Sequence, residues 1–259
     1  MKEERQQRIV SLLHEHRTLS LQQLAEHCGV STETVRRDLT ELDAAGYVSR
    51  VHGGAVIRGG LMPMLNLSER LHSQTSEKRE LSLRACDFVS ENDVIFIDSG
   101  STAVVFAEQL KQRFSRLTVI THSLDVFMML RDTKYRLILS GGTLKREENA
   151  FVGPTALEVM ESYHANKAFL CPTAVSIEFG LCDLYEDLLV IQRTMLKNAD
   201  TVFVLADSTK LEKEALLRIS TAKSEYQYIS DSGVCTALRT LYKENGLALH
   251  CYEALEGKR

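Results

Sequence analysis

The chain has 259 residues, of which 44% are hydrophobic and 25% charged, and its formal net charge at pH 7 is −4. This profile is typical of a globular protein with one or two domains, and it excludes a polycation that binds nucleic acid through its overall charge. No apolar run is long enough for a transmembrane helix, and the polar residues 1–5 do not resemble a signal peptide, so we expect a cytoplasmic protein without a membrane partner.

The first sixty residues carry the pattern of three short helices. Ile9 and Leu13 stand on one face of the first. The second begins at Ser20, which forms a capping-box pattern with Gln23, and it ends at Gly29 as a C-terminal glycine would. A third helix follows after a few residues. Two helices joined by a tight glycine turn predict a helix-turn-helix.

The third predicted helix begins at Ser31 and buries Val35, Leu39 and Leu42. Its outer face carries short hydroxyl side chains and two arginines, which are suited to phosphates and base edges. The alternative is a solvated face on which an arginine pairs with Asp38 or Glu41.

Residues 47–57 form two β-rich runs around Gly53 and Gly54, a pattern that predicts a hairpin. A hairpin placed directly after a recognition helix is a wing. Basic and acidic residues balance within the first sixty, so the positive footprint must come from local clustering. We predict that DNA is contacted by Ser31, Thr32, Thr34, Arg36, Arg37, Arg50 and His52.

Beyond residue 57 the pattern changes. Residues 58–75 have no clean periodicity and are interpreted as a linker with a short ordered stretch, between a DNA-binding domain at 1–57 and a second domain at 76–259. In that second domain helical patterns alternate with apolar runs, which predicts a Rossmann-like, mostly parallel α/β sheet. The predicted strands are residues 94–97, 117–121, 136–140, 167–170, 201–205, 226–230 and 248–251.

Small polar residues follow several of these strands, at the edge where α/β sheets bind ligands. The loop at 98–102 leads into a helix, whose free N–H groups and dipole favour an anion. Lys210 can meet an anion, and Asp98 or Asp207 can accept hydroxyl groups. Four such strand ends predict a site for a small anionic ligand, formed by Asp98, Ser99, Gly100, Ser101, Thr102, Ser123, Gly141, Gly142, Asp207 and Lys210.

No metal or cofactor is expected. The six cysteines have no metal-site spacing, and free thiols in the cytosol are the simplest interpretation. His122 and His164 also lack partners at a ligand spacing, and we interpret them as ordinary polar residues.

Residues 30–39, together with Leu42, Gly46 and residues 50–55, closely resemble the DeoR family of bacterial regulators. Segments 98–102, 121–123, 151–154, 167–169 and 206–210 resemble the sensor domain of that family, so the resemblance covers nearly the whole chain. It implies an operator-binding domain whose third helix enters the major groove of double-stranded DNA. It also implies a repressor of sugar-catabolism genes that is a dimer or a tetramer.

The resemblance further implies that the second domain is similar in fold to ribose-5-phosphate isomerase. A sugar-phosphate effector would then place its phosphate on residues 99–102, near Lys210. Two positions depart from the family. Ala174 stands where a glycine is usual, and Leu188 stands where a glutamate is usual. Glu186 and Asp187 lie close to Leu188, so a small loop shift would restore a carboxylate.

Two other functions fit the same residues. The first is an active sugar-phosphate isomerase with a DNA-binding appendage, because Asp98, Asp207, Glu186 and Asp187 offer carboxylates that an isomerase needs as a base. The second is an architectural DNA-binding protein without a ligand. Turnover of pentose and hexose phosphates would distinguish the first from a regulator. Mutation of the loop at 98–102 would distinguish the second, because regulation by an architectural protein would then stay unchanged.

Overall fold

The computed structural model describes residues 2–16, 18–44, 48–51, 53–57 and 67–253. The chain divides into two compact units, one of residues 1–60 with 233–246 and a larger one of residues 61–232 with 247–259. The expected limits at 57 and 76 stay predictions. Within the expected linker, residues 58–66 lie outside the described part, and Leu67–His72 form a helix that belongs to the larger unit.

The smaller unit contains the expected three helices and hairpin. Its helices are α1 (Lys2–His16), α2 (Leu21–Cys28), α3 (Thr32–Ala44) and α10 (Thr236–Glu244). Its antiparallel sheet has the order β1-β3-β2, with β1 (Thr18–Ser20), β2 (Val48–Val51) and β3 (Gly54–Ile57). The first strand was not expected, because three residues are too few to show a period.

The capping box that the sequence predicts is present at the start of α2. The Ser20 hydroxyl accepts a hydrogen bond from the Gln23 backbone N–H at 3.2 Å, and the Gln23 side chain accepts one from the Ser20 N–H at 2.9 Å. Gly29 ends the helix with a φ of 64°, a left-handed conformation that glycine adopts without strain. These bonds fix the entry and exit of α2, so the turn into α3 is set locally.

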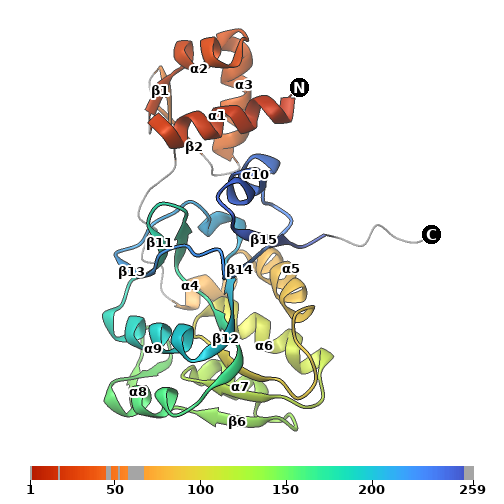
Figure 1. Ribbon diagram of the computed structural model, residues 1–259, viewed down its shortest axis with the longest axis vertical. Coiled ribbons are helices and arrows are strands. Elements are labelled where there is room, and N and C mark those ends of the chain that lie inside the picture. Colours follow the sequence, from red (N-terminus) through yellow and green to blue (C-terminus); the bar gives the residue numbers. More distant parts are fainter. Residues whose placement is uncertain (1, 17, 45–47, 52, 58–66, 254–259) are drawn as a thin grey trace, which may run out of the picture. The chain divides into compact units, whose positions relative to one another are not determined.

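The larger unit is built on a seven-stranded sheet in which every pair is parallel, in the order β15-β14-β12-β9-β4-β5-β6 (Figure 1). Each strand is one that the sequence predicts. They are β4 (Val94–Ile97), β5 (Thr118–Thr121), β6 (Arg136–Leu139), β9 (Ala165–Leu170), β12 (Ala199–Leu205), β14 (Gln227–Ser230) and β15 (Ala248–Cys251).

Helices cover both faces of this sheet, as the parallel pattern requires. On one face pack α5 (Thr75–Cys86), α6 (Ser101–Arg113) and α7 (Leu124–Leu130), and on the other lie α8 (Pro154–Glu161) and α9 (Glu186–Lys197) (Figure 1). The short α4 (Leu67–His72) precedes α5, and a 3-10 turn, η1 (Ser208–Lys210), follows β12. None of the described helices has both the length and the apolar content to cross a membrane.

Two small antiparallel sheets stand outside the main one. One joins β7 (Thr143–Lys145) to β8 (Ala150–Val152), and the other has the order β10-β11-β13, with β10 (Ala174–Ser176), β11 (Gly180–Asp183) and β13 (Leu217–Ser220). The sequence does not predict them, because these short segments take their extended conformation from the strands with which they pair.

The order of strands reverses between β4 and β9. From β4 the chain moves through β5 to β6 on one side, and from β9 it moves through β12 and β14 to β15 on the other. The loops that follow β4 and β9 therefore diverge. Such a switch point leaves a crevice at the carboxyl edge of a parallel sheet, which is where ligands bind in this architecture.

Candidate functional site

The outward face of α3 carries the side chains expected to meet DNA. Thr32, Arg36 and Arg37 are exposed, whereas Val35 and Leu39 on the opposite face are buried. The Ser31 hydroxyl accepts a hydrogen bond from the Thr34 N–H at 3.3 Å and lies 2.9 Å from the Thr34 hydroxyl. Ser31 therefore caps the helix and holds Thr34 at its first turn.

The two arginines of α3 are not neutralised by Asp38. That carboxylate is buried and bonds Arg5 of α1, with N···O distances of 2.5 and 3.1 Å. Arg36 instead forms an exposed ion pair with Glu33 at 2.6 Å. The Arg37 side chain has no ionic or hydrogen-bonding partner within the described part of the chain. An exposed pair of this kind is worth little in water, so both guanidinium groups are available to an anion.

The hairpin places one predicted contact beside the helix. Arg50 on β2 is exposed and donates a hydrogen bond to the Thr40 hydroxyl of α3 at 3.1 Å. The hairpin and the helix thus present arginines on a common side of the unit. His52, the last of the predicted DNA contacts, lies outside the described residues.

In the larger unit a cavity of about 130 Å³ opens at the switch point. Its walls come from α4, the turn after it and the start of α5, from the start of α6, and from the loops after β9, β11 and β12. The lining residues are Arg70, Ser73, Gln74, Lys78, Ser101, Thr173, Leu184, Asp207, Thr209 and Lys210. Three of these, Ser101, Asp207 and Lys210, are among the residues predicted from the sequence.

The loop after β4 has the geometry expected of an anion site. Gly100 stands before the first turn of α6 with φ 96° and ψ 172°, a conformation that is essentially restricted to glycine. No side chain caps this 13-residue helix. The Thr102 hydroxyl in its first turn is buried and has no hydrogen-bond partner among the described residues. The backbone N–H groups at this end are thus left to a ligand.

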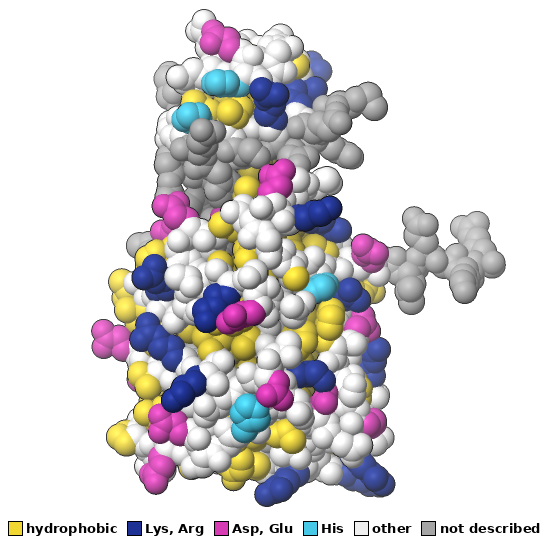
Figure 2. All heavy atoms as spheres, viewed as in Figure 1, with side chains coloured by type: hydrophobic (Ala, Val, Ile, Leu, Met, Phe, Trp, Pro, Cys, Tyr) yellow, Lys and Arg dark blue, Asp and Glu magenta, His cyan; other side chains and the backbone are white. Residues whose placement is uncertain are grey.

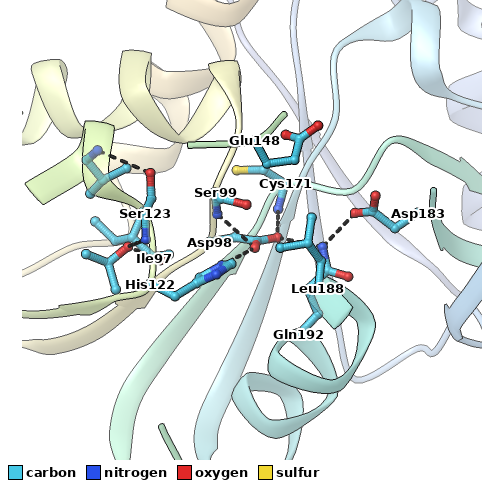
Figure 3. Close-up of polar contacts among 12 residues, drawn as sticks. Ile97, Asp98, Ser99, His122, Ser123, Glu148, Cys171, Asp183, Leu188 and Gln192 are labelled. Carbon is cyan, nitrogen blue, oxygen red and sulfur yellow. Dashed lines mark hydrogen bonds and ion pairs between the residues drawn. The ribbon is translucent and has the colours of Figure 1, made fainter. Parts of the chain in front are cut away.

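Asp98 lies beneath this loop and holds it. Its two oxygens accept four hydrogen bonds, shown in Figure 3. They come from the Ser99 N–H at 2.8 Å, His122 Nε2 at 3.1 Å, the Cys171 N–H at 3.0 Å and Gln192 Nε2 at 3.2 Å. Asp98 is fully buried and does not line the cavity. The geometry gives it a role in positioning the loops after β4 and β9, and its direct contact with a ligand stays a prediction.

A second carboxylate shares the same amide. Gln192 also donates to Asp183 at 2.7 Å, and Asp183 accepts further bonds from the Thr173 hydroxyl and the Leu184 N–H. Burial raises the pKa of Asp183 to about 6, and the nearby negative charge of Asp98 adds to this. Asp183 therefore anchors two residues of the cavity wall, Thr173 and Leu184.

The cavity concentrates positive charge. The ammonium group of Lys210 donates to the carbonyl of Pro172 at 3.1 Å, and that of Lys78 donates to the carbonyls of Ser73, at 2.6 Å, and Arg70. Neither ammonium has a carboxylate within 4.0 Å in the described part of the chain. Burial, with the positive charge of Lys210 close by, lowers the pKa of Lys78 to about 8. A cavity with two such ammonium groups favours an anion.

Charge of one sign does not gather in the same way on the face of the larger unit drawn in Figure 2. On that face, Lys and Arg side chains are interspersed with Asp and Glu side chains.

The other predicted ligand residues lie elsewhere on the carboxyl edge. Ser123 caps α7 by accepting a hydrogen bond from Val126, and Gly141 and Gly142 turn the chain from β6 into β7 with positive φ. None of these three lines the cavity, and their contact with a ligand stays a prediction. Asp207 does line it, and its carboxylate accepts a hydrogen bond from the Thr209 hydroxyl at 2.5 Å.

The sequence prediction missed Arg70 and Lys78. Arg70 lies in a stretch interpreted as linker. Lys78 shares a helical face with Leu81 and Ala85, which are fully buried. A lysine within an otherwise buried stripe is costly to desolvate, and that signal would have drawn attention to Lys78.

Two family models match the chain. A DeoR-like helix-turn-helix domain matches residues 5–58, and the DeoR C-terminal sensor domain matches residues 73–232. The chain belongs to the DeoR family. The expected resemblance is thereby confirmed, and this DeoR-family protein is a DNA-binding transcriptional regulator with a sensor domain.

Relatives of this DeoR-family regulator match over nearly their full length. The HTH-type transcriptional regulator GolR of Listeria innocua is 31% identical over 253 residues, which are 96% of this chain and 98% of the relative. The lactose phosphotransferase system repressor of Lactococcus lactis is 34% identical over 82% of this chain and 84% of its own.

Among solved structures, ribose 5-phosphate isomerase A of Methanocaldococcus jannaschii is similar over 52% of this chain and 53% of its own. The identity is 20% and the TM-score 0.39, a likeness too slight to say anything about activity.

The two departures from the family pattern are buried. Ala174 pairs with Cys182 in the small sheet, and Leu188 packs against Ala150 and Val152. Neither neighbouring carboxylate lines the cavity, since Asp187 pairs with Lys145 at 3.1 Å and Glu186 is exposed. Ala174 and Leu188 do not line the cavity, and Asp207 is the one carboxylate residue among its described lining residues.

Proposed function

We propose that this DeoR-family regulator is a repressor of a carbohydrate-catabolism operon, released from its operator when a phosphorylated sugar occupies the cavity at the switch point. The observation that carries the proposal is the pair of ammonium groups, Lys78 and Lys210, beside the uncapped start of α6. Charge-assisted hydrogen bonds from such donors are stronger than those to neutral groups. The name of the Lactococcus lactis relative supports the carbohydrate part of the proposal.

The proposed effector residues have distinct roles. The phosphate lies on residues 99–102 and meets Lys210, while Asp207 accepts a hydroxyl group of the sugar. Asp98 positions the loop from below. No catalytic step is part of the proposal, and turnover of pentose or hexose phosphates by the purified protein would contradict it.

The operator is contacted by the residues predicted from the sequence. In this proposal α3 enters the major groove with Thr32, Thr34, Arg36 and Arg37, Ser31 fixes its start, and Arg50 and His52 meet the backbone from the hairpin. The protein works in the cytoplasm, where bacterial DNA lies. It binds as a dimer or tetramer, with half-sites one helical turn or a multiple apart.

The first test is thermal unfolding of the full chain with a panel of sugar phosphates, each beside its unphosphorylated sugar. A ligand at a hundred times its dissociation constant stabilises the folded state by about 2.7 kcal/mol. We expect a shift with one class of phosphate ester and none with its parent sugar. Lys210→Met should abolish the shift. Lys167→Met should keep it, because Lys167 lies on β9 and pairs with Asp93.

The second test is release from DNA. Genomic fragments retained by the immobilised protein identify the operator, and the stabilising compound is then added. Retention of the operator at saturating compound would contradict the proposed repressor function.

A further inference from the structure

One wall of the cavity is formed by the first two helices of the larger unit and the turn between them. Arg70, Ser73, Gln74 and Lys78 all line the cavity, and they belong to α4, to the start of α5 and to the turn between these helices. We refer to residues 67–78 as the connector. It begins directly after residues 58–66, so the DNA-binding domain and the cavity wall are adjacent along the chain.

Lys78, in the second helix of the connector, forms hydrogen bonds with the end of the first helix and with the turn. Its side chain is 2% exposed, and its ammonium group donates to the carbonyls of Arg70 and Ser73, at the end of α4 and in the following turn. Both acceptors are neutral. A phosphate oxygen is a stronger acceptor for an ammonium group than a carbonyl, so an anion in the cavity competes for this donor.

The Arg70 guanidinium group also has a protein acceptor on one side and the cavity loop on the other. Its Nη2 donates to both carboxylate oxygens of Glu148 at 2.5 Å, and Glu148 does not line the cavity. Its Nη1 lies beside the anion loop, since a Cβ added to Gly100 would come within 3.5 Å of it. Within the described residues Nη1 has no hydrogen-bond acceptor. One edge of the guanidinium is therefore held by a carboxylate, and the other faces the loop.

The turn between the two helices is in an unusual conformation. Gln74 has φ 50° and ψ 41°, a left-handed conformation that is uncommon for a residue with a side chain. Such a residue stores strain that the surrounding contacts must hold in place. This turn is held by the Lys78 ammonium hydrogen bonds and by the Ser73 hydroxyl, which donates to the Arg70 carbonyl at 3.2 Å. An anion in the cavity would weaken the Lys78 bonds.

We infer that Arg70 and Lys78 bind the phosphate of the effector, and that they leave Glu148 and the carbonyls of the connector in order to do so. This inference rests on the proposed function and deepens it. Binding at the cavity then rearranges the connector, whose N-terminal end leads into the linker. The occupied and empty states differ first in the connector, and the difference reaches the DNA-binding domain along the chain.

The test uses the full chain and inorganic phosphate, with chloride at equal ionic strength as the control. Isothermal titration measures affinity for the wild type and for Arg70→Met, Lys78→Met, Lys210→Met, Glu148→Gln and Lys167→Met. We expect a tenfold or greater loss for Arg70→Met and Lys78→Met and no change for Lys167→Met. Glu148→Gln should bind phosphate at least threefold more tightly, because it frees Arg70 without altering the cavity wall.

Hydrogen exchange of the connector provides the second readout. Phosphate should change the exchange rates of amides in residues 67–78 of the wild type and of Lys167→Met. The gain expected for Glu148→Gln keeps the test decisive even where Lys78→Met fails to fold.

The outcomes separate the two proposals. Loss of binding in Lys210→Met alone, with Arg70→Met, Lys78→Met and Glu148→Gln all within twofold of the wild type, would overturn the inference and leave the proposed function standing. Weaker binding in Glu148→Gln, or unchanged exchange in the connector, would also overturn the inference. If the wild type binds neither phosphate nor any sugar phosphate, both proposals fail.

Discussion

Gln192 bridges two buried carboxylates with a single amide group. Its nitrogen donates to Asp98 at 3.2 Å and to Asp183 at 2.7 Å. All three side chains are buried. Two like charges this close are tolerated only because donors from the backbone and from His122 surround Asp98. The residue that tolerates substitution least in this cluster should therefore be the shared donor.

Gln192→Glu should lower the free energy of unfolding by about 3 kcal/mol at pH 7, because it replaces the donor by a third buried carboxylate. The folded pKa of Asp183 is raised to about 6. Its ionised form is thus disfavoured in the folded state, and the penalty shrinks as pH falls below 6. Denaturant unfolding at pH 7 and pH 5 measures the difference, which should be smaller at pH 5. Gln192→Met, which adds no charge, should show a smaller loss at pH 7 that depends less on pH.

Lys78 gives phosphate binding a characteristic pH dependence. The pKa of Lys78 is lowered to about 8 by burial and by neighbouring positive charge, and a bound anion favours the protonated form. Above pH 8 the protein must take up a proton to bind, so the dissociation constant should rise by up to about tenfold per pH unit. The second pKa of a phosphate ester is about 6, so the charge of the ligand is constant in this range. Titration calorimetry with the stabilising sugar phosphate between pH 7 and 9.5 should show this rise of the dissociation constant in the wild type. Lys78→Met should lack the change in slope near pH 8.

At the scale of elements, the sheet of the smaller unit depends on one close approach. A Cβ added to Gly54 on β3 would lie 2.3 Å from the carbonyl oxygen of Leu19 on β1, whereas one added to Gly53 would meet no atom within 4 Å. Gly54→Ala should therefore separate β1 from β3. We expect lower DNA affinity and faster hydrogen exchange in the peptides that contain β1 and β3, with the larger unit unchanged.

Gly53→Ala is the matched control, since its cost is confined to its own left-handed φ of 83°. Equal effects of the two substitutions would mean that the strand approach at Gly54 is not what holds this sheet.

The strands differ in how well the sequence predicts them. All seven strands of the parallel sheet were predicted, because a strand covered on both faces is a continuous apolar run, as Val94–Ile97 is. The strands of the small sheets were missed, since residues such as Thr143–Lys145 carry no such run and extend only because Ala150–Val152 pairs with them.

The candidate site was predicted in part for a related reason. Ser101, Asp207 and Lys210 follow strands, and the strand rule finds them. Arg70 and Lys78 come from helices that precede the first strand of the sheet. Only the fold brings them to its carboxyl edge, so no rule based on strand ends could include them.

At the scale of the whole molecule, DNA binding should depend on a few phosphate contacts, because the net charge of the chain is −4. Each such contact contributes about one unit to the slope of log affinity against log salt concentration. Arg37→Ala should reduce this slope by about one and weaken binding to all duplexes alike, if Arg37 meets a phosphate. Glu33→Gln, which releases Arg36 from its exposed partner, should leave affinity unchanged or raise it slightly. Fluorescence anisotropy with a labelled operator and a scrambled duplex, at several salt concentrations, measures both effects.

The two units must also influence each other equally in both directions. If a saturating effector lowers operator affinity by a given factor, saturating operator must lower effector affinity by the same factor, because both describe one coupling free energy. For a coupling of about 2 kcal/mol the factor is about thirty. Titration of the stabilising sugar phosphate into the free protein and into its operator complex measures one factor, and operator binding with and without the compound measures the other. Glu148→Gln, which loosens the connector without touching DNA, should change both factors together. A factor that keeps growing with the concentration of the compound, instead of levelling off, would mean that the compound and the operator compete for one face rather than being coupled through the fold.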